Sequence, residues 1–180
     1  MKKNKSVCVF CSSSNNVEEK YRRSAKKLAQ ILSSNNITII YGGGNTGMMG
    51  DLADTCIENK GDIIGVIPQF LKKRENLHQN LTKVYIENNM HSRKMKMYKL
   101  SDIFICLPGG YGTLDEFIEV IAWKQLGIHN KVIILINIDN YWSKLLKFFD
   151  EIDNKRFTYN DKSSLFKIIN KIEEIVTIIN

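Results

Sequence analysis

A glycine-rich turn followed by two carboxylates could bind a phosphate and act on the group attached to it. Residues 108–116 read PGGYGTLDE, and they follow an apolar run at 103–107 that predicts a buried strand. The apolar residues after the turn predict a helix. The first turn of a helix leaves N–H groups unpaired and its dipole favours anions, while glycines let a phosphate approach the backbone closely. The segment therefore predicts a phosphate cradle, with Glu116 directed at the sugar of a nucleotide.

The same residues have a purely structural interpretation. Thr113 and Glu116 stand three residues apart, which is the spacing of a capping box at a helix N-terminus. In that interpretation the helix starts at Thr113, and the two side chains only cap it. The local sequence leaves both interpretations open.

A second glycine loop lies at residues 42–47, GGGNTG, and satisfies the pattern G-x-G-x-x-G. In a dinucleotide-binding fold this pattern follows the first strand, and an acidic residue ends the next one. Here the loop follows the second predicted strand, and Asp62 begins the third, which argues against NAD or FAD. We expect instead that Gly43 and Gly44 help to shape a mononucleotide pocket. A tight turn without a ligand is the alternative.

Arg93 and Lys94 stand near the start of a predicted helix at 90–100. Neighbouring residues on a helix point in different directions, so one can face a ligand while the other faces solvent or a second group. Arginine presents a planar fork that matches phosphate or carboxylate. A solvated basic face of the helix is the alternative.

Strands and helices alternate along the chain. Short apolar runs predict strands at 7–11, 37–41, 63–67, 84–86, 103–107 and 132–136. Helical patterns lie between them and continue in amphipathic segments at 141–150 and 165–179. We therefore predict an α/β fold, a doubly wound and mainly parallel sheet with helices on both faces (Rossmann-like), in a single domain over 1–180. The loops at 12–16, 42–47 and 108–112 would meet at the carboxyl edge of the sheet, where such folds bind ligands.

Composition narrows the class of protein further. The chain has 180 residues, 43% hydrophobic and 25% charged, which is ordinary for a globular domain. No stretch approaches the roughly 20 apolar residues that span a bilayer, and the apolar run at 7–10 is too short for a signal peptide, so we expect a cytoplasmic protein without a membrane partner. The net charge of +7 is spread along the chain and predicts no dedicated nucleic-acid surface. The four cysteines predict buried free thiols, and the three histidines share no metal-ligand spacing, so we expect no metal.

Taken together, the motifs resemble the LONELY GUY (LOG) family of cytokinin riboside 5′-monophosphate phosphoribohydrolases, which are often mislabelled lysine decarboxylases. The similarity runs in order from residue 7 to residue 141, and its most specific part is the Arg-Lys pair combined with P-G-G-x-G-T-x-x-E. It is carried by the segments 8–11 (CVFC), 41–44 (YGGG), 47–50 (GMMG), 65–68 (GVIP), 90–94 (MHSRK) and 108–116.

The resemblance implies that a homodimer without a cofactor hydrolyses a nucleoside 5′-monophosphate, AMP or isopentenyladenosine monophosphate, to free base and ribose 5-phosphate. It implies that Arg93 and Glu116 are the catalytic pair. It places at the substrate Glu75, Met90, Lys94, Gly109, Gly110, Tyr111, Gly112, Thr113, Leu114 and Asp115. The alternative is a non-catalytic nucleotide- or cofactor-binding module such as a molybdenum-cofactor carrier, because those proteins are similar in fold. The sequence leaves open whether adenine or N6-prenylated adenine is the preferred base.

Overall fold

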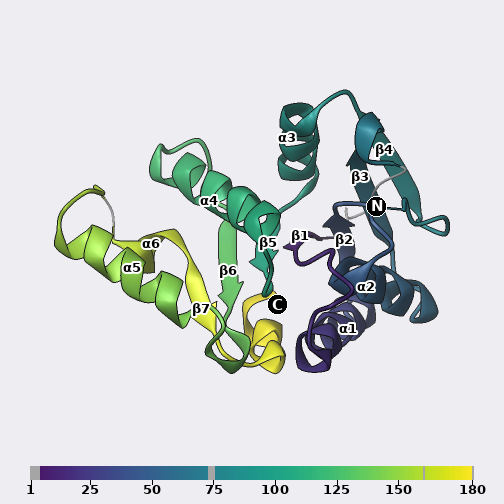
Figure 1. Cartoon of the computed structure of the whole chain (residues 1–180), viewed down its shortest axis with the longest axis horizontal. Helices are drawn as coiled ribbons and strands as arrows, with labels where there is room; N and C mark the ends of the chain where they lie inside the picture. The colour runs from purple at the N-terminus through teal and green to yellow at the C-terminus, as the bar shows by residue number, and fades with distance from the viewer. Residues whose placement is uncertain (1–4, 73–75, 160, 180) are drawn as a thin grey trace.

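Seven parallel strands form one sheet through the centre of the molecule (Figure 1). The computed structural model describes residues 5–72, 76–159 and 161–179. Every neighbouring pair of strands is parallel, so the predicted α/β class is confirmed. In their spatial order the strands are β4 (Lys83–Glu87), β3 (Ile63–Pro68), β2 (Thr38–Tyr41), β1 (Ser6–Phe10), β5 (Ile103–Cys106), β6 (Val132–Ile136) and β7 (Lys167–Ile169).

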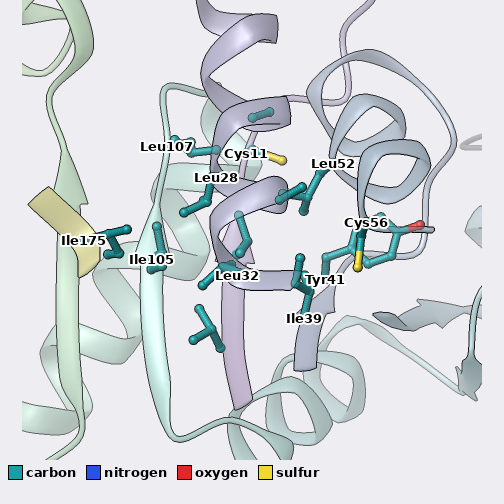
Figure 2. Close-up of a cluster of buried hydrophobic side chains, with 14 of the residues drawn as sticks. Cys11, Leu28, Leu32, Ile39, Tyr41, Leu52, Cys56, Ile105, Leu107 and Ile175 are labelled. Carbon is teal, nitrogen blue, oxygen red and sulfur yellow. The ribbon is translucent and has the colours of Figure 1, made fainter. Parts of the chain in front are cut away.

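The side chains of each strand alternate between two apolar cores, one on each face of the sheet. In β1, Val7 and Val9 join the core under α1 and α2, whereas Cys8 and Phe10 join the core under α3, α4 and α5. Figure 2 shows the first of these cores. Helices therefore cover both faces, as predicted. Their bounds are α1 Glu19–Ser34, α2 Gly47–Glu58, α3 Met90–Leu100, α4 Tyr111–Gln125 and α5 Ser143–Asn154.

The order of the strands reverses between β1 and β5. The chain runs outward from β1 to β4 at one edge, returns to the centre at β5, and continues to β7 at the other edge. In doubly wound sheets, ligands bind at such a switch point, beyond the carboxyl ends of the strands. The loops that follow β1 and β5 are the serine loop at 12–16 and the glycine-rich turn at 108–112, so both lie at the expected ligand site.

The C-terminal segment differs from the prediction, because residues 165–179 do not form one amphipathic helix. Helix α6 (Lys162–Leu165) is followed by strand β7, a 3-10 turn (Ile172–Ile175) and helix α7 (Val176–Ile179). In the register of the sheet, Ile169 lies opposite Ile136 of β6. Isoleucine-rich runs suit strands as well as helices, and the edge of β6 offers backbone groups that need partners, so the segment extends the sheet.

All four cysteines are free and buried, as predicted. Cys8 and Cys11, which have C-x-x-C spacing, belong to cores on opposite faces of the sheet. Among the described residues, no helix has both the length and the apolar character that a membrane crossing requires.

Candidate active site

A pocket of about 350 Å³ opens at the carboxyl edge of the sheet, beside the switch point. Its walls come from the loop after β1, from α2, and from the N-terminal turns of α3 and α4. The lining residues are Cys11, Ser12, Ser13, Ser14, Met49, Met90, Arg93, Gly110, Tyr111, Gly112, Thr113 and Glu116. The structure thus brings the two residues predicted to be catalytic together with most of the glycine-rich turn.

Arg93 and Glu116 form a buried ion pair in this pocket. Arg93 Nη2 lies 3.6 Å from Glu116 Oε1, with 7% of the arginine side chain and 12% of the glutamate side chain exposed. Two further contacts fix the guanidinium, because Nε donates to the Val66 carbonyl at 3.1 Å and Nη1 lies 3.7 Å from Met90 Sδ. The attraction between the two charges is stronger in this enclosed site than it would be in water.

Gly42 leaves the space that the guanidinium occupies, and sequence analysis did not select it. A Cβ atom at position 42 would lie 2.3 Å from Arg93 Nη2. The predicted residues Gly43 and Gly44 instead bind the segment 77–78. The Gly43 carbonyl accepts from the His78 N–H at 3.0 Å, and Gly44 forms a β-bridge to Leu77. They do not belong to the described lining of the pocket. The position of Gly42 directly after β2 is the sequence feature that could have identified it as a site residue.

Helix α4 begins two residues earlier than predicted, at Tyr111, with Gly110 as its N-cap. Thr113 is therefore inside the first turn, and the capping-box interpretation is wrong. The Thr113 side chain packs against Gly109, where a Cβ atom would lie 2.1 Å from Thr113 Oγ1. A Cβ atom on Gly110 or Gly112 would meet no atom within 4 Å. The backbone at the start of α4 is thus open to the pocket, as a phosphate cradle requires.

Lys94 neighbours Arg93 on α3 but contacts a different group of carboxylates on α4. Its Nζ lies 3.1 Å from Asp115 Oδ2 and 3.0 Å from Glu119 Oε1. Burial acts to lower the pKa of Lys94, but the hydrogen bonds and charges of Glu119 and Asp115 outweigh it, so the pKa is raised. The predicted divergence of the two basic neighbours is confirmed. Lys94 and Asp115 connect α3 to α4 and are not part of the described pocket lining.

Of the three remaining residues predicted to contact the substrate, two have described positions, and neither lines this pocket. Leu114 packs against the core on the α3 and α4 side of the sheet. Gly109 lines a neighbouring cavity, on the Tyr141 side of the glycine-rich turn. Glu75 lies outside the described residues.

The serine loop after β1 forms one wall of the pocket, and the second glycine loop holds it in place. Thr46 Oγ1 donates to the Ser13 carbonyl at 2.8 Å, and the Gly47 N–H donates to Asn15 Oδ1 at 2.8 Å. Gly47 has a φ of +56°, and a Cβ atom there would lie 2.3 Å from the Ser14 carbonyl oxygen, so the position requires glycine. Sequence analysis predicts the loop at the ligand edge but assigns no role to its serines. The run of hydroxyl-bearing residues directly after a strand is the sequence feature that could have identified the serines as lining residues.

Cys11 also lines the pocket, at the end of β1. Burial, together with the charges of Glu116 and Asp51, raises the pKa of its thiol well above the ordinary value. The thiol therefore stays protonated at neutral pH and is not activated as a nucleophile. Glu116 is the carboxylate that the described lining offers for acid–base chemistry.

The fold is shared with solved structures of low sequence identity. A molybdenum-cofactor carrier protein from Chlamydomonas reinhardtii superposes with a TM-score of 0.75 at 16% identity, covering 98% of this chain and 96% of that one. A molybdenum-cofactor binding protein from Rippkaea orientalis gives a TM-score of 0.74 at 19% identity, covering 99% and 97%. At these identities the likeness establishes the fold alone.

Sequence comparison identifies the family. The family model described as "Possible lysine decarboxylase" matches residues 49–179. The chain is 41% identical over 172 residues to cytokinin riboside 5′-monophosphate phosphoribohydrolase LOG5 of Arabidopsis thaliana, covering 96% of this chain and 75% of that one. It is 46% identical over 152 residues to the probable phosphoribohydrolase LOGL2 of Oryza sativa subsp. japonica, covering 84% and 62%. The chain therefore belongs to the LONELY GUY family of cytokinin riboside 5′-monophosphate phosphoribohydrolases.

Proposed function

We propose that the protein hydrolyses the N-glycosidic bond of a nucleoside 5′-monophosphate, giving a free purine base and ribose 5-phosphate. The observation that carries this proposal is the buried Arg93–Glu116 pair, 3.6 Å apart, in a pocket that also reaches the first turn of α4. One pocket thus offers a carboxylate for the sugar and N–H donors for the phosphate. The identity to relatives named as phosphoribohydrolases supports the same activity.

The phosphate, in this proposal, binds at the N-terminus of α4. The N–H groups of residues 110–112 and the helix dipole favour an anion there, and the glycines allow a close approach. Glu116 stands on the next turn of the same helix and lines the same pocket. The ribose would extend from the first turn of the helix toward its carboxylate.

Bond breaking builds positive charge on the ribose, as in other glycosyl transfers. Glu116 stabilises that charge and takes a proton from the attacking water, whose oxygen forms the new bond to C1′. The electron pair of the broken bond leaves with the base, whose ring nitrogen takes up one proton from the solvent, and the proton on Glu116 returns to the solvent. Arg93 orients the Glu116 carboxylate and balances its charge.

Release of free base, followed by chromatography, tests the activity. We expect the purified protein to release base from AMP or from isopentenyladenosine monophosphate, and Glu116→Gln to be slower by about 100-fold or more. Glu119→Gln is the matched control, because Glu119 stands on the same helix but contacts Lys94. Unchanged hydrolysis in Glu116→Gln would contradict the proposal. Tight nucleotide binding without base release would favour the carrier function instead.

We also propose adenine or N6-prenylated adenine as the base, and a cytoplasmic location. Met49 and Met90 line the pocket and supply adaptable apolar surface that suits either base. Four free, buried thiols fit a reducing compartment. The ratio of the two hydrolysis rates identifies the preferred base.

We further propose a homodimer in which a second copy covers apolar side chains exposed on α4. Tyr111 is 93% exposed, and Ile118, seven residues later on the same side of the helix, is 41% exposed. Leu126 and Ile128, just beyond the end of the helix, are 74% and 56% exposed. Exposed apolar side chains of this size are typical of protein–protein contacts when they gather on one face. Light scattering should give twice the chain mass of 20.8 kDa, and Ile118→Lys should shift the mass toward one chain; a single-chain mass for the unmodified protein would contradict the dimer.

A further inference from the structure

We propose that Tyr141 is a positioning residue for the phosphate-binding turn, and that its hydroxyl fixes the peptide between Gly109 and Gly110 so that the Gly110 N–H faces the substrate pocket. The inference rests on the proposed function, because that function assigns the phosphate to this turn. Tyr141 belongs to the loop after β6, far along the chain from the glycine-rich motif.

One hydrogen bond joins Tyr141 to the glycine-rich turn. Tyr141 Oη donates to the Gly109 carbonyl at 2.7 Å. That carbonyl and the Gly110 N–H belong to one planar trans peptide, so they point in opposite directions. A contact that holds the carbonyl toward Tyr141 therefore turns the N–H away from Tyr141.

The cavities on either side of the turn fit this direction. Tyr141 and Gly109 line a cavity of about 300 Å³. Gly110 lines both this cavity and the substrate pocket, so it lies between the two. The carbonyl is held on the Tyr141 side, which leaves the N–H for the substrate side.

The ring of Tyr141 is itself held in place. It makes edge-to-face contacts with Tyr21 and Trp142, with ring centroids 5.4 Å and 4.7 Å apart. The preceding residues Asp139 and Asn140 adopt left-handed backbone angles, with φ of 49° and 58°, which Asp and Asn adopt more readily than other non-glycine residues. The two ring contacts therefore hold the hydroxyl at Gly109.

The hydroxyl remains a donor across the neutral range. Burial, with Tyr21 and Cys106 nearby, raises the pKa of Tyr141 above its ordinary value. Without this donor the peptide between Gly109 and Gly110 loses the contact that sets its direction. Rotation of the peptide would present a carbonyl oxygen to the phosphate in place of an N–H, which replaces attraction by repulsion.

Tyr141→Phe removes the hydroxyl and keeps the ring. We expect the KM for AMP to rise about five- to tenfold, the effect of one lost hydrogen bond, while kcat changes less than about twofold. Tyr21→Phe is the matched control, because it makes the same chemical change on the adjacent ring and leaves the bond to Gly109 in place. Thermal unfolding of both variants separates an effect on KM from a general loss of structure.

The outcomes separate this inference from the proposed function. If the unmodified protein hydrolyses AMP, the proposed function stands, and an unchanged KM in Tyr141→Phe overturns the positioning role alone. An equal rise of KM in Tyr21→Phe also overturns it. If the unmodified protein releases no base, calorimetric titration with ribose 5-phosphate takes the place of KM. A loss of affinity confined to Tyr141→Phe then supports the role, and equal affinities overturn it.

Discussion

Two neighbouring basic residues, Arg93 and Lys94, connect α3 to α4 through ion pairs, and their surroundings differ. Arg93 meets Glu116 with 7% and 12% of the side chains exposed, and the Val66 carbonyl holds the guanidinium as well. Lys94 meets Asp115 and Glu119, with 15% of the lysine side chain, 55% of the Asp115 side chain and 19% of the Glu119 side chain exposed. Adjacent residues of one helix thus present the same charge in two settings.

This difference indicates which pair is suited to chemistry and which to holding the helices together. An ion pair in contact with water contributes about 0–1 kcal/mol, because solvent screens it. Removing one partner of a buried pair costs about 3–5 kcal/mol, because it leaves a charge buried without its partner. We therefore expect Arg93 to be indispensable and Lys94 to be replaceable.

The largest effect should come from Arg93→Met, which removes the guanidinium that lies 3.6 Å from Glu116 Oε1 and donates to the Val66 carbonyl. We expect the free energy of unfolding to fall by about 3 kcal/mol or more, and base release to slow by about 100-fold or more. Arg93→Lys keeps the charge but loses the fork that reaches both Val66 and Glu116, so it should restore more stability than activity. Urea unfolding and base-release assays measure the two effects. Near-normal activity in Arg93→Met would contradict the expectation that Arg93 is indispensable and Lys94 is replaceable.

A smaller effect is expected from Gly42→Ala, which tests whether space is what preserves the buried pair. The new Cβ atom would lie 2.3 Å from Arg93 Nη2, so the guanidinium must move. Misplacement of a catalytic group by one ångström lowers rates by up to about 100-fold, and we expect kcat/KM to fall about 10- to 100-fold. The double variant Gly42→Ala with Arg93→Met is the control, since it should be no less active than Arg93→Met alone if the alanine acts through Arg93. Additive losses would show that it acts elsewhere.

Lys94→Met removes the less buried of the two basic side chains. It leaves Asp115 and Glu119 without their lysine. Solvent reaches Asp115 but only 19% of the Glu119 side chain is exposed, so we expect the free energy of unfolding to fall by about 1–2 kcal/mol, less than in Arg93→Met. Since Lys94 does not belong to the described pocket lining, base release should stay within about threefold of the unmodified protein. The same unfolding and activity assays apply. A loss of activity as large as that of Arg93→Met would instead support the predicted contact of Lys94 with the substrate.

The fold was predictable wherever one signal dominated. The helix Met90–Leu100 and the strand Ile103–Cys106 appear within a residue of their predicted bounds, because a clear change of period separates them. Residues 165–179 carry a pattern that suits a helix as well as a strand. The exposed edge of β6 decides between them, and that edge exists only in the folded sheet.

In the site, the sequence predicted which residues carry the chemistry, but it did not predict which residues pack against them in space. Arg93 and Glu116 stand in motifs of specific chemistry, and the structure brings them together. The requirement for glycine at position 42 arises from a guanidinium on α3, a contact between distant parts of the chain that spacing does not encode. The capping-box interpretation of Thr113 failed because local sequence does not fix the first residue of a helix.

His129 is a buried ionisable group of another kind, with the charges of Lys124 and Lys131 nearby. Its Nε2 lies 2.9 Å from the Val120 carbonyl, and its Nδ1 accepts from the Lys131 N–H at 3.1 Å, which fits the neutral ring. Burial lowers the pKa of His129. The hydrogen bond to Val120 opposes that shift, and the charges of Lys131 and Lys124 add to it.

The smallest predicted effect follows from this lowered pKa. The folded-state pKa lies below the ordinary value of 6.5, so the unfolded chain binds more protons on His129 in the interval between them. The resulting stability is complete above pH 6.5 and is lost as the pH falls through that value toward the folded pKa. Between about pH 7 and about pH 5 we expect His129 to account for part of the lost unfolding free energy, so that His129→Gln loses less than the unmodified protein. Urea unfolding at the two pH values measures this difference, and equal losses in both proteins would assign the pH dependence to other groups.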